Sequence, residues 1–543
     1  MIRSAVAGCQ ADEFPPKGGF VLAQPILFGE YRYDLTNDMG FLWSAFRMDR
    51  RTFLKAMTTA AAAAAAHHFR WAGVIPVRAA QDTAAGPALH ILNRATWGPT
   101  PADLAAINER GIAGWLDWQL DYESIPDPAI DAFLRENAIL LQSYEELSAA
   151  ATVDYGNVMN RFLWGRIIRA AFSTRQLYER MVEFWTDHFN VPAADLLTEK
   201  IIDDREVIRR HALGSFRDLL HASATSPAML IYLDNTYSYS DHPNENYGRE
   251  LLELHTLGVD GGYTERDVKE VARILTGWGV SDERWGYFGF NAWAHDFRPK
   301  RALGELFDAG HGIGEGQRLL DLLAAHPSTA RFIAYKLVRY FVSDDPPQSL
   351  VDSTVQVFLA TDGDIKSLLR HIFTSAEFYA HPGEKLRRPL EYLTAILRVL
   401  QPHLSVVNGR WLIWSLEQFD HLPYHWAPPD GYPQVSAAWL NTSALLARWN
   451  LAFIIPRSDE RWYDGLRFDQ AGIFAEARTV GEYVDLAAQQ FYGVPISDAD
   501  RTALIEFAAE GGGPDTPVDD DWRGWKQSSL LGLMLASPYF QWA

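Results

Sequence analysis

Apolar residues recur along most of the chain at the three- and four-residue spacing of amphipathic helices. Alternation of apolar and polar positions, which marks half-buried strands, is scarce. From Leu89 onward the pattern predicts a mainly α fold, with Thr100 and Pro101 opening one helix and Gly111 after its end. Further helices are expected at about residues 129–150, 157–172, 174–190, 199–222, 245–257, 265–276, 315–341, 349–380, 385–402, 435–453, 480–493, 498–509 and 523–536.

Two long stretches, residues 279–312 and 403–434, lack the helical spacing and are rich in Gly, Pro, Trp, Tyr and His. Loops of this length in a compact domain are usually functional or disordered. Their aromatic content favours order. The sequence therefore predicts one large helical domain over residues 89–543, with little strand and two long ordered loops.

An export signal is predicted well inside the chain, where "DRRTFLKAMTTAAAAAAA" (residues 49–66) joins an arginine pair to a short apolar run. This pattern resembles a twin-arginine signal. We expect translation to start at Met48, residues 1–47 to be an over-called extension, 48–80 to be the signal peptide and 81–88 a linker. The protein would then pass through the twin-arginine translocase and be periplasmic or secreted. The alternative is that residues 56–66 form a short helix in an ordinary tail.

Composition removes several classes of function. The net charge of −20 argues against sequence-independent nucleic-acid binding and against an anionic membrane face. The single cysteine, Cys9, lies in the predicted extension, so the mature chain would lack disulfides, thiolate metal sites and iron–sulfur clusters. Nucleotide-cofactor and haem c signatures are absent from the sequence, as are the common hydrolase and zinc-protease motifs. No stretch after the signal is long and apolar enough to predict a membrane span.

The densest polar motif is "NENYGRELLELHTLG", residues 244–258, with Gly258 placed as a helix C-cap. In one interpretation its polar side faces water, and Arg249 pairs with Glu253 four residues later. In the other, Glu250 and Glu253 share a site as acid and base or as ligands of a hard cation. An α-helix turns by about 100° per residue. One side of this helix then carries Tyr247, Leu251, Leu254 and His255, and the other carries Asn246, Arg249, Glu250 and Glu253.

Histidines supply a second candidate group. His188 lies in the apolar stripe of the helix predicted at residues 174–190. It is either a hydrogen-bonded core histidine or a base or metal ligand that faces the Glu250 helix. His188, Glu250 and Glu253 are thus the tentative ligands of a divalent metal. Further along, His295 stands beside Asp296, with Lys300 four residues later. A loop ion cluster is the alternative interpretation there.

The segment "GGYTERDVKEVARILTGWG", residues 261–279, predicts a turn, a helix and a turn. Thr264 and Asp267 form a box-like start. Arg273 lies off the apolar face, where it can pair with a carboxylate.

Taken together, "HILNRATWGPTPADLAAINERGIAGWLDWQL", "MVEFWTDHFNV", "NENYGRELLELHTLGVDGGYTERDVKEVARILTGW", "HDFRPKRALG", "HPSTARFIAYKLVRYFVSDDPP", "GYPQVSAAWLNTSALLARWN" and "LASPYF" resemble, in this order, the bacterial family called domain of unknown function 1800. The resemblance covers Leu89 to the C-terminus. It implies a large, mainly helical, exported protein, often encoded beside an exported family that resembles sulfatases, and it supplies no activity. The family often has a glycine where this chain has Arg298. The matching motif residues are His188, Asn244, Asn246, Arg249, Glu250, Glu253, Tyr263, Thr264, Asp267, His295 and Asp296.

Two functions follow as hypotheses. The first is an exported enzyme that performs hydrolytic or acid–base chemistry on an envelope or extracellular polymer, with or without a divalent metal. The second is a non-catalytic partner of a sulfatase-like exported protein, with residues 279–312 and 403–434 as its binding surface. For the enzyme, the expected catalytic residues are Glu250, Glu253, His188, His295 and Asp296, and the expected binding residues are Asn246, Arg249, Arg273 and Lys300.

Overall fold

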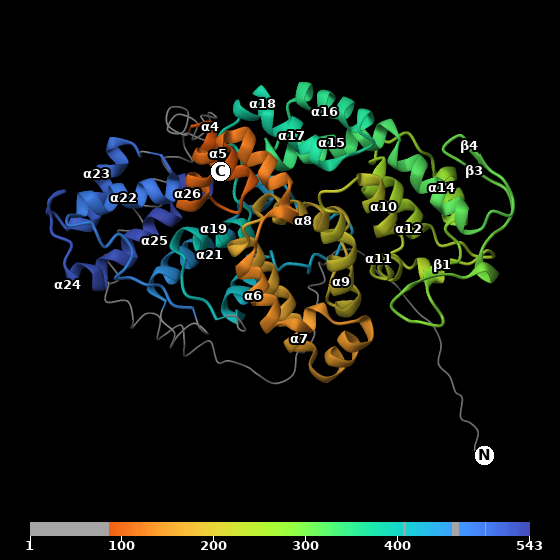
Figure 1. The fold of residues 1–543 in the computed structure, drawn as a ribbon, viewed down its shortest axis with the longest axis horizontal. Helices are drawn as coiled ribbons and strands as arrows, with labels where there is room; N and C mark the ends of the chain where they lie inside the picture. Colours follow the sequence, from red (N-terminus) through yellow and green to blue (C-terminus); the bar gives the residue numbers. More distant parts are fainter. Residues whose placement is uncertain (1–85, 406–408, 459–465, 495) are drawn as a thin grey trace, which may run out of the picture. The chain divides into compact units, whose positions relative to one another are not determined.

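Capped helices and short connections make up most of the protein, whose computed structural model describes residues 86–405, 409–458, 466–494 and 496–543 (Figure 1). The predicted extension and signal peptide (1–47 and 48–80) lie outside the described residues, as does most of the linker 81–88. The α-helices are α4 (Pro87–Ala95), α5 (Pro101–Leu120), α6 (Pro128–Glu136), α7 (Tyr144–Phe172), α8 (Gln176–His188), α9 (Leu197–Asp203), α10 (Phe216–Ala224), α11 (Pro227–Tyr232), α12 (Glu245–Glu250), α13 (Glu265–Ile274), α14 (Ile313–Ala324), α15 (Pro327–Phe341), α16 (Gln348–Ala360), α17 (Ile365–Thr374), α18 (Ala376–Tyr379), α19 (Pro389–Leu400), α20 (Arg410–Gln418), α21 (Thr442–Ile454), α22 (Val480–Tyr492), α23 (Asp498–Ala509), α24 (Asp520–Trp522), α25 (Ser528–Ala536) and α26 (Pro538–Gln541).

Shorter elements complete the chain. The π-helical segments are η3 (Asp204–Arg209), η5 (Leu251–Thr256) and η9 (Arg523–Gln527). The 3-10 segments are η1 (Tyr122–Ser124), η2 (Ala138–Leu141), η4 (Asn235–Tyr237), η6 (Ala292–Ala294), η7 (Ser436–Trp439) and η8 (Ile455–Arg457). The strands are β1 (Trp278–Val280), β2 (Phe288–Phe290), β3 (Lys300–Ala302) and β4 (Glu305–Phe307).

The predicted mainly α fold is confirmed, and its helices begin where the sequence offers caps. Thr100 caps α5 and Thr264 caps α13, each in a reciprocal box with the aspartate three residues later. Gly111, at φ 69° and ψ 166°, is non-helical and divides the range of α5 into two helices across a kink, so one helix ends before Gly111, as expected, and another follows it. Several of the predicted helices are divided, among them those expected at 129–150, 199–222, 315–341 and 349–380. His326 and Pro327 start α15 within the run expected at 315–341, because a proline fits only the first turn of a helix.

Strand occurs within residues 279–312, which were expected to be an irregular loop. Trp278 pairs with Phe290 in the antiparallel β1–β2 hairpin, and Lys300 pairs with Phe307 in the antiparallel β3–β4 hairpin. Each pairing spans three residues, too short for the alternation of polar and apolar positions to be visible in the sequence. The stretch is therefore ordered, as its aromatic content indicated.

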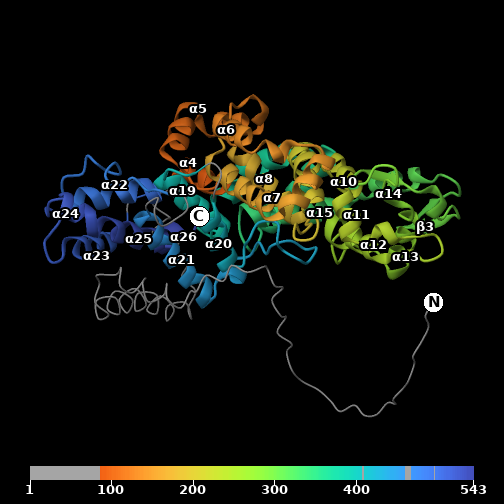
Figure 2. The same ribbon diagram turned by 90° about the horizontal axis from the view of Figure 1, so that it is seen from below.

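Two large clusters of buried apolar side chains form the core. The first gathers around α8, α10 and α13 to α17, and the second around α7, α19, α22 and α25. Helices α7 and α8 are neighbours in space, as Figures 1 and 2 show, although their apolar faces belong to different clusters. None of the helices in the described part of the chain has the length and apolar character needed to cross a bilayer.

A buried ion network, which we call the α8 network, spans the boundary between the clusters. Glu179, Glu183 and Asp187 lie on α8 at four-residue intervals and are all buried. From α7, the guanidinium of Arg166 binds Glu179 at 3.1 Å and Glu183 at 2.6 Å. Arg388, which precedes α19, binds Asp187 at 2.7 Å and Glu183 at 3.3 Å. The network therefore joins α8 of the first cluster to α7 and α19 of the second.

Replacing Arg166 tests how much the fold depends on this network. We expect Arg166→Met to lower the free energy of unfolding by about 3–5 kcal/mol, because it leaves buried carboxylates short of a partner. Urea unfolding monitored by circular dichroism measures the change. The control is Arg501→Met, which breaks the exposed 2.6 Å pair with Asp485 and should cost about 0–1 kcal/mol. Equal effects of the two substitutions would contradict this assignment.

Candidate functional site

His188 lies at the C-terminal end of α8, buried among aromatic rings. Its Nε2 atom is 3.1 Å from the backbone oxygen of His255, and its Nδ1 atom is 3.0 Å from the Nζ atom of Lys336. Burial, with the nearby charge of Lys336, lowers the pKa of His188 well below its ordinary value. The ring is thus a neutral tautomer that donates from Nε2 to the carbonyl and accepts from Lys336 at Nδ1. It is a hydrogen-bonded core histidine that faces the Glu250 helix.

Lys336, on α15, is the functional candidate that sequence reasoning missed. Burial lowers the pKa of its ammonium group to about 8, while the carboxylates of Asp187 and Asp430 act in the opposite direction. Burial also raises the pKa of Asp187 above the ordinary range of an aspartate. The only sequence signal for Lys336 is a lysine set between the buried positions Ala334 and Leu337.

The polar motif changes from α-helix to π-helix along its length. The chain is α-helical up to Glu250 and then continues as the π-helical η5, in which the Leu257 amide donates to the oxygen of Leu252 at 2.9 Å. The apolar face is as predicted for Tyr247, Leu251 and His255, which are buried, whereas Leu254 is only half-buried. Gly258 follows at φ 80°, in agreement with its expected place as a C-cap.

Glu250 and Glu253 are both half-buried near this turn. Burial raises the pKa of Glu250, and the charges of Glu253 and Asp430 add to the shift. The expected pairing of Arg249 with Glu253 is wrong. Arg249 binds Glu265 at 2.7 Å and Glu245 at 3.4 Å instead.

The reason is geometric, because Glu253 lies past the start of the π-helical turn, where four-residue neighbours no longer align as they do in an α-helix. Glu253 accepts a long contact from the Tyr263 hydroxyl, at 3.5 Å. Asn246 is exposed, and its backbone N–H donates to the side-chain oxygen of Asn244 at 2.9 Å.

His295, Asp296 and Lys300 meet in a second group, which we call the loop anchor, together with Arg273 and Glu315. Asp296 accepts from the Nε of Arg273 at 2.8 Å. Lys300 donates to the carboxylate of Glu315 and to the backbone oxygen of Asp296. His295 approaches the backbone oxygen of Thr276 at 2.8 Å through Nδ1, and its Nε2 lies 3.7 Å from Glu315.

Arg298, at the place where the resembled family often has glycine, adds a further bond to Asp296 at 2.6 Å. Together with Arg273 it holds the pKa of that carboxyl well below its usual range. The geometry corresponds to the loop ion cluster that was the alternative interpretation of the His295–Asp296 pair.

The expected site residues thus lie in three places: His188 beside Lys336, Glu250 and Glu253 on the polar motif, and the loop anchor. Within the described residues, no hydrogen bond or ion pair links His188 to Glu250 or Glu253, or links any of these three to the loop anchor. The described part of the chain also lacks a group of three or more His, Cys, Asp and Glu side chains arranged to hold a metal ion. The divalent-metal set of His188, Glu250 and Glu253 stays a prediction.

Residues 426–430, within the stretch 403–434, are hydrogen-bonded to two earlier segments of the chain. The Asn190 amide donates to the backbone oxygens of Trp426 and Pro428, at 2.9 and 2.7 Å, and Tyr232 donates to that of Ala427 at 2.6 Å. Trp426 donates to Asp430 at 2.8 Å. The charge of Asp430 acts on both Glu250 and Lys336, so residues 426–430 bring an acidic group near both.

A cluster of rings, which we call the aromatic patch, consists of Trp293, two residues before His295 of the loop anchor, and of Tyr239 and His242 from an earlier segment. The ring of Tyr239 is 4.9 Å from that of His242 and 5.7 Å from that of Trp293. Trp293 is 73% exposed. The amide of Ser240 donates to the oxygen of Ala294 at 2.8 Å, so the two segments that carry the patch are tied through their backbones.

Comparison with known proteins gives one match. The family described as "Protein of unknown function (DUF1800)" matches residues 90–542. No curated protein and no solved structure matches the chain. The match covers nearly all of the described helices, including α8, the polar motif and both aromatic stretches. The chain therefore belongs to this family of proteins of unknown function.

Proposed function

We propose that the protein is an exported, non-catalytic binding protein whose aromatic patch docks a sulfatase-like exported protein. The observation that carries this proposal is the exposure of Trp293 on a loop that buried ion pairs hold in place. The identity of the partner is taken from what the family resemblance implies, and export is taken from the twin-arginine pattern of residues 48–80.

A rigid, exposed tryptophan is suited to binding a partner. Trp and Tyr dominate the energetic centres of protein interfaces, because they bury large areas at little cost in conformational entropy. Asp296 and Lys300 are buried, and both lie within seven residues of Trp293. The loop is thus ordered before any partner binds, which reduces the entropic cost of association. On this proposal His295, Asp296, Lys300 and Arg273 position the patch.

Truncation of Trp293 tests the aromatic patch. Tagged protein recovered from the native periplasm should carry the sulfatase-like protein encoded beside it, identified by mass spectrometry. We expect Trp293→Ala to reduce that recovery about tenfold, the effect of losing about 1.4 kcal/mol at an interface hot spot. The control is Leu359→Ala on α16, which truncates an apolar side chain that is 43% exposed outside the patch. Undiminished recovery with Trp293→Ala, or a wild-type protein without this partner, would contradict the proposal.

Export is tested separately. Replacing Arg50 and Arg51 with lysine should keep the protein in the cytoplasm, because the paired arginines identify the substrate to the translocase. Cell fractionation and N-terminal sequencing measure the outcome, and the mature chain is expected to begin at about residue 80. A mature N-terminus that precedes Arg50 would overturn the assignment.

A second candidate function, acid–base catalysis, is favoured by the contact between Lys336 and the neutral His188. A lysine with a pKa of about 8 can donate a proton as the ammonium and accept one as the amine near neutral pH, and His188 and Asp187 lie close enough to influence it. Besides Asp187, this candidate function has a second carboxyl group in Glu250, whose pKa is raised by burial.

Titration of Lys336 tests this second function. Amine labelling followed by mass spectrometry should give a reaction midpoint near pH 8, with the exposed Lys269 as a reference for reagent performance. The variants Lys336→Met and His188→Gln should then fold and yet fail to replace the wild-type gene in cells, whereas Lys269→Met should replace it. Folded His188→Gln protein that supports cells like the wild type would exclude a catalytic role.

A further inference from the structure

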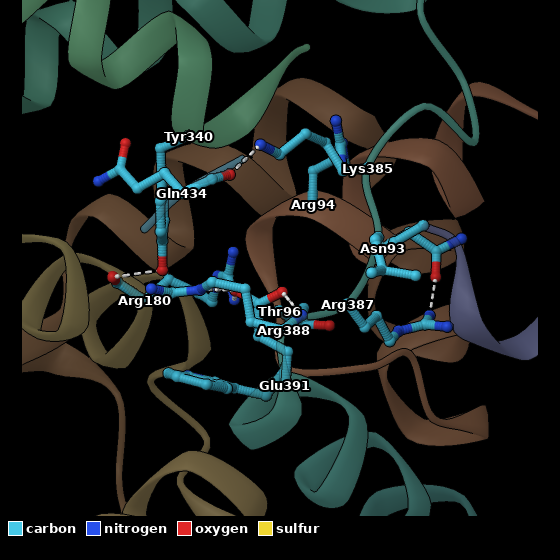
Figure 3. A pocket seen from close by; sticks show the side chains of 13 residues that line it. Asn93, Arg94, Thr96, Arg180, Tyr340, Lys385, Arg387, Arg388, Glu391 and Gln434 are labelled. Carbon is cyan, nitrogen blue, oxygen red and sulfur yellow. Dashed lines mark hydrogen bonds and ion pairs between the residues drawn. The ribbon is translucent and has the colours of Figure 1, made fainter. Parts of the chain in front are cut away.

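A buried cavity lies among residues of α4, α8 and α15 and the segment that leads into α19 (Figure 3). The volume of the cavity is about 20 Å³. This is room for about one water-sized guest. The charged side chains that line it are Arg94, Arg180, Lys385, Arg387, Arg388 and Glu391.

Some of the lining cations form ion pairs with carboxylates and others do not. Arg388 and Arg180 bind Glu391, at 3.1 and 2.7 Å, and Lys385 binds Asp344. Arg94, in contrast, donates to the backbone oxygen of Val342. Buried charges in proteins are normally paired, so a lining arginine held by a neutral acceptor is a departure from the rule.

Arg387 is the second such cation. Its guanidinium donates to the backbone oxygens of Phe540 and Trp542 and to the side chain of Asn93, the last at 2.7 Å. Among the described residues, neither Arg387 nor Arg94 has a carboxylate within ion-pair distance. Burial lowers the pKa of Arg94 to about 9 and that of Arg387 to about 10, and the charge of Arg180 adds to both shifts. The charges of Glu391, Asp344 and Glu384 oppose the shift at Arg94, and that of Glu391 opposes it at Arg387, without an ion pair to either guanidinium. The cavity is thus lined by two buried cations that form no ion pair among the described residues.

Three hydrogen-bond donors of the lining residues also lack an acceptor. They are the Nε atoms of Arg94 and Arg180 and the indole Nε1 of Trp97, all buried and without a hydrogen-bond partner. An unpaired buried donor costs about 1–3 kcal/mol, so a set of three on one small cavity calls for an acceptor. The guanidinium of Arg180 is fixed between two rings, 5.0 Å from the centre of Trp97 and 4.6 Å from that of Tyr340.

We propose that this cavity binds one small inorganic anion of the size of chloride. The two cations without an ion-pair partner favour a negative charge, and the unpaired Nε–H and indole N–H groups favour a hydrogen-bond acceptor. The volume admits a guest close to the size of water and therefore favours a halide over a larger oxyanion. The bound ion would connect α4 and α8 to the start of α19, beside the α8 network.

The test is a chloride titration of the full chain at constant ionic strength, with gluconate as the replacing anion. Above the dissociation constant, each tenfold rise in chloride should raise the folding equilibrium constant about tenfold, as measured by urea unfolding. Chlorine-35 NMR should show line broadening from the bound ion. Arg94→Met should abolish both effects. Arg501→Met, which removes an exposed guanidinium, should retain both effects.

Equal stability in chloride and gluconate, together with no broadening of the chlorine signal by the wild type, would overturn the proposal. Stabilisation by phosphate in place of chloride would overturn it as well, because the guest would then be an oxyanion. If Arg94→Met does not fold, Arg387→Met takes its place. The NMR measurement on the wild type decides the matter without any variant.

Discussion

The pairing of charges along α8 is the constraint on which the rest of the structure depends. Three acidic side chains at four-residue spacing lie on one line of a fully buried helix, so each must find a cation inside the protein. Arg166 of α7 and Arg388, the residue before α19, come from the side of the other apolar cluster, while Glu179 also binds Arg209 of η3 at 2.9 Å. The two clusters are therefore held together by polar bonds as well as by packing, and these bonds fix their relative register because guanidinium groups bind carboxylates in few geometries.

The same helix ends at the candidate site. Asp187 belongs to the α8 network and also acts on Lys336, while the next residue, His188, touches Lys336 directly. A change in the protonation of Lys336 is thus felt by groups that hold the fold together. This coupling distinguishes the site from the loop anchor, where Asp296 and Lys300 form ion pairs that hold a single loop.

Much of the fold could be predicted from the sequence, because helices and their caps are local. Thr264 with Asp267 marked a helix start, Gly258 marked an end, and the buried side of Tyr247, Leu251 and His255 followed from periodicity. The candidate site was less accessible. Lys336 resembles any lysine of an amphipathic helix until tertiary packing sets it against His188. The pairing of Arg249 with Glu265 depended on a helix-to-helix contact and on a π turn, neither of which a helical wheel contains.

The π-helical turn η5 also has a consequence for how this segment tolerates change in length. Its hydrogen bonds close over five residues, so Leu251 to Thr256 hold one residue more than an α-helix would place there, and Thr256 reaches back to the oxygen of Leu251 at 2.6 Å. Removing a single residue here would let the helix close regularly with the flanking residues facing as before, whereas the same deletion in a regular α-helix would rotate everything that follows by about 100°. The wide turn thus accommodates one extra residue between the polar motif and the capped helix α13.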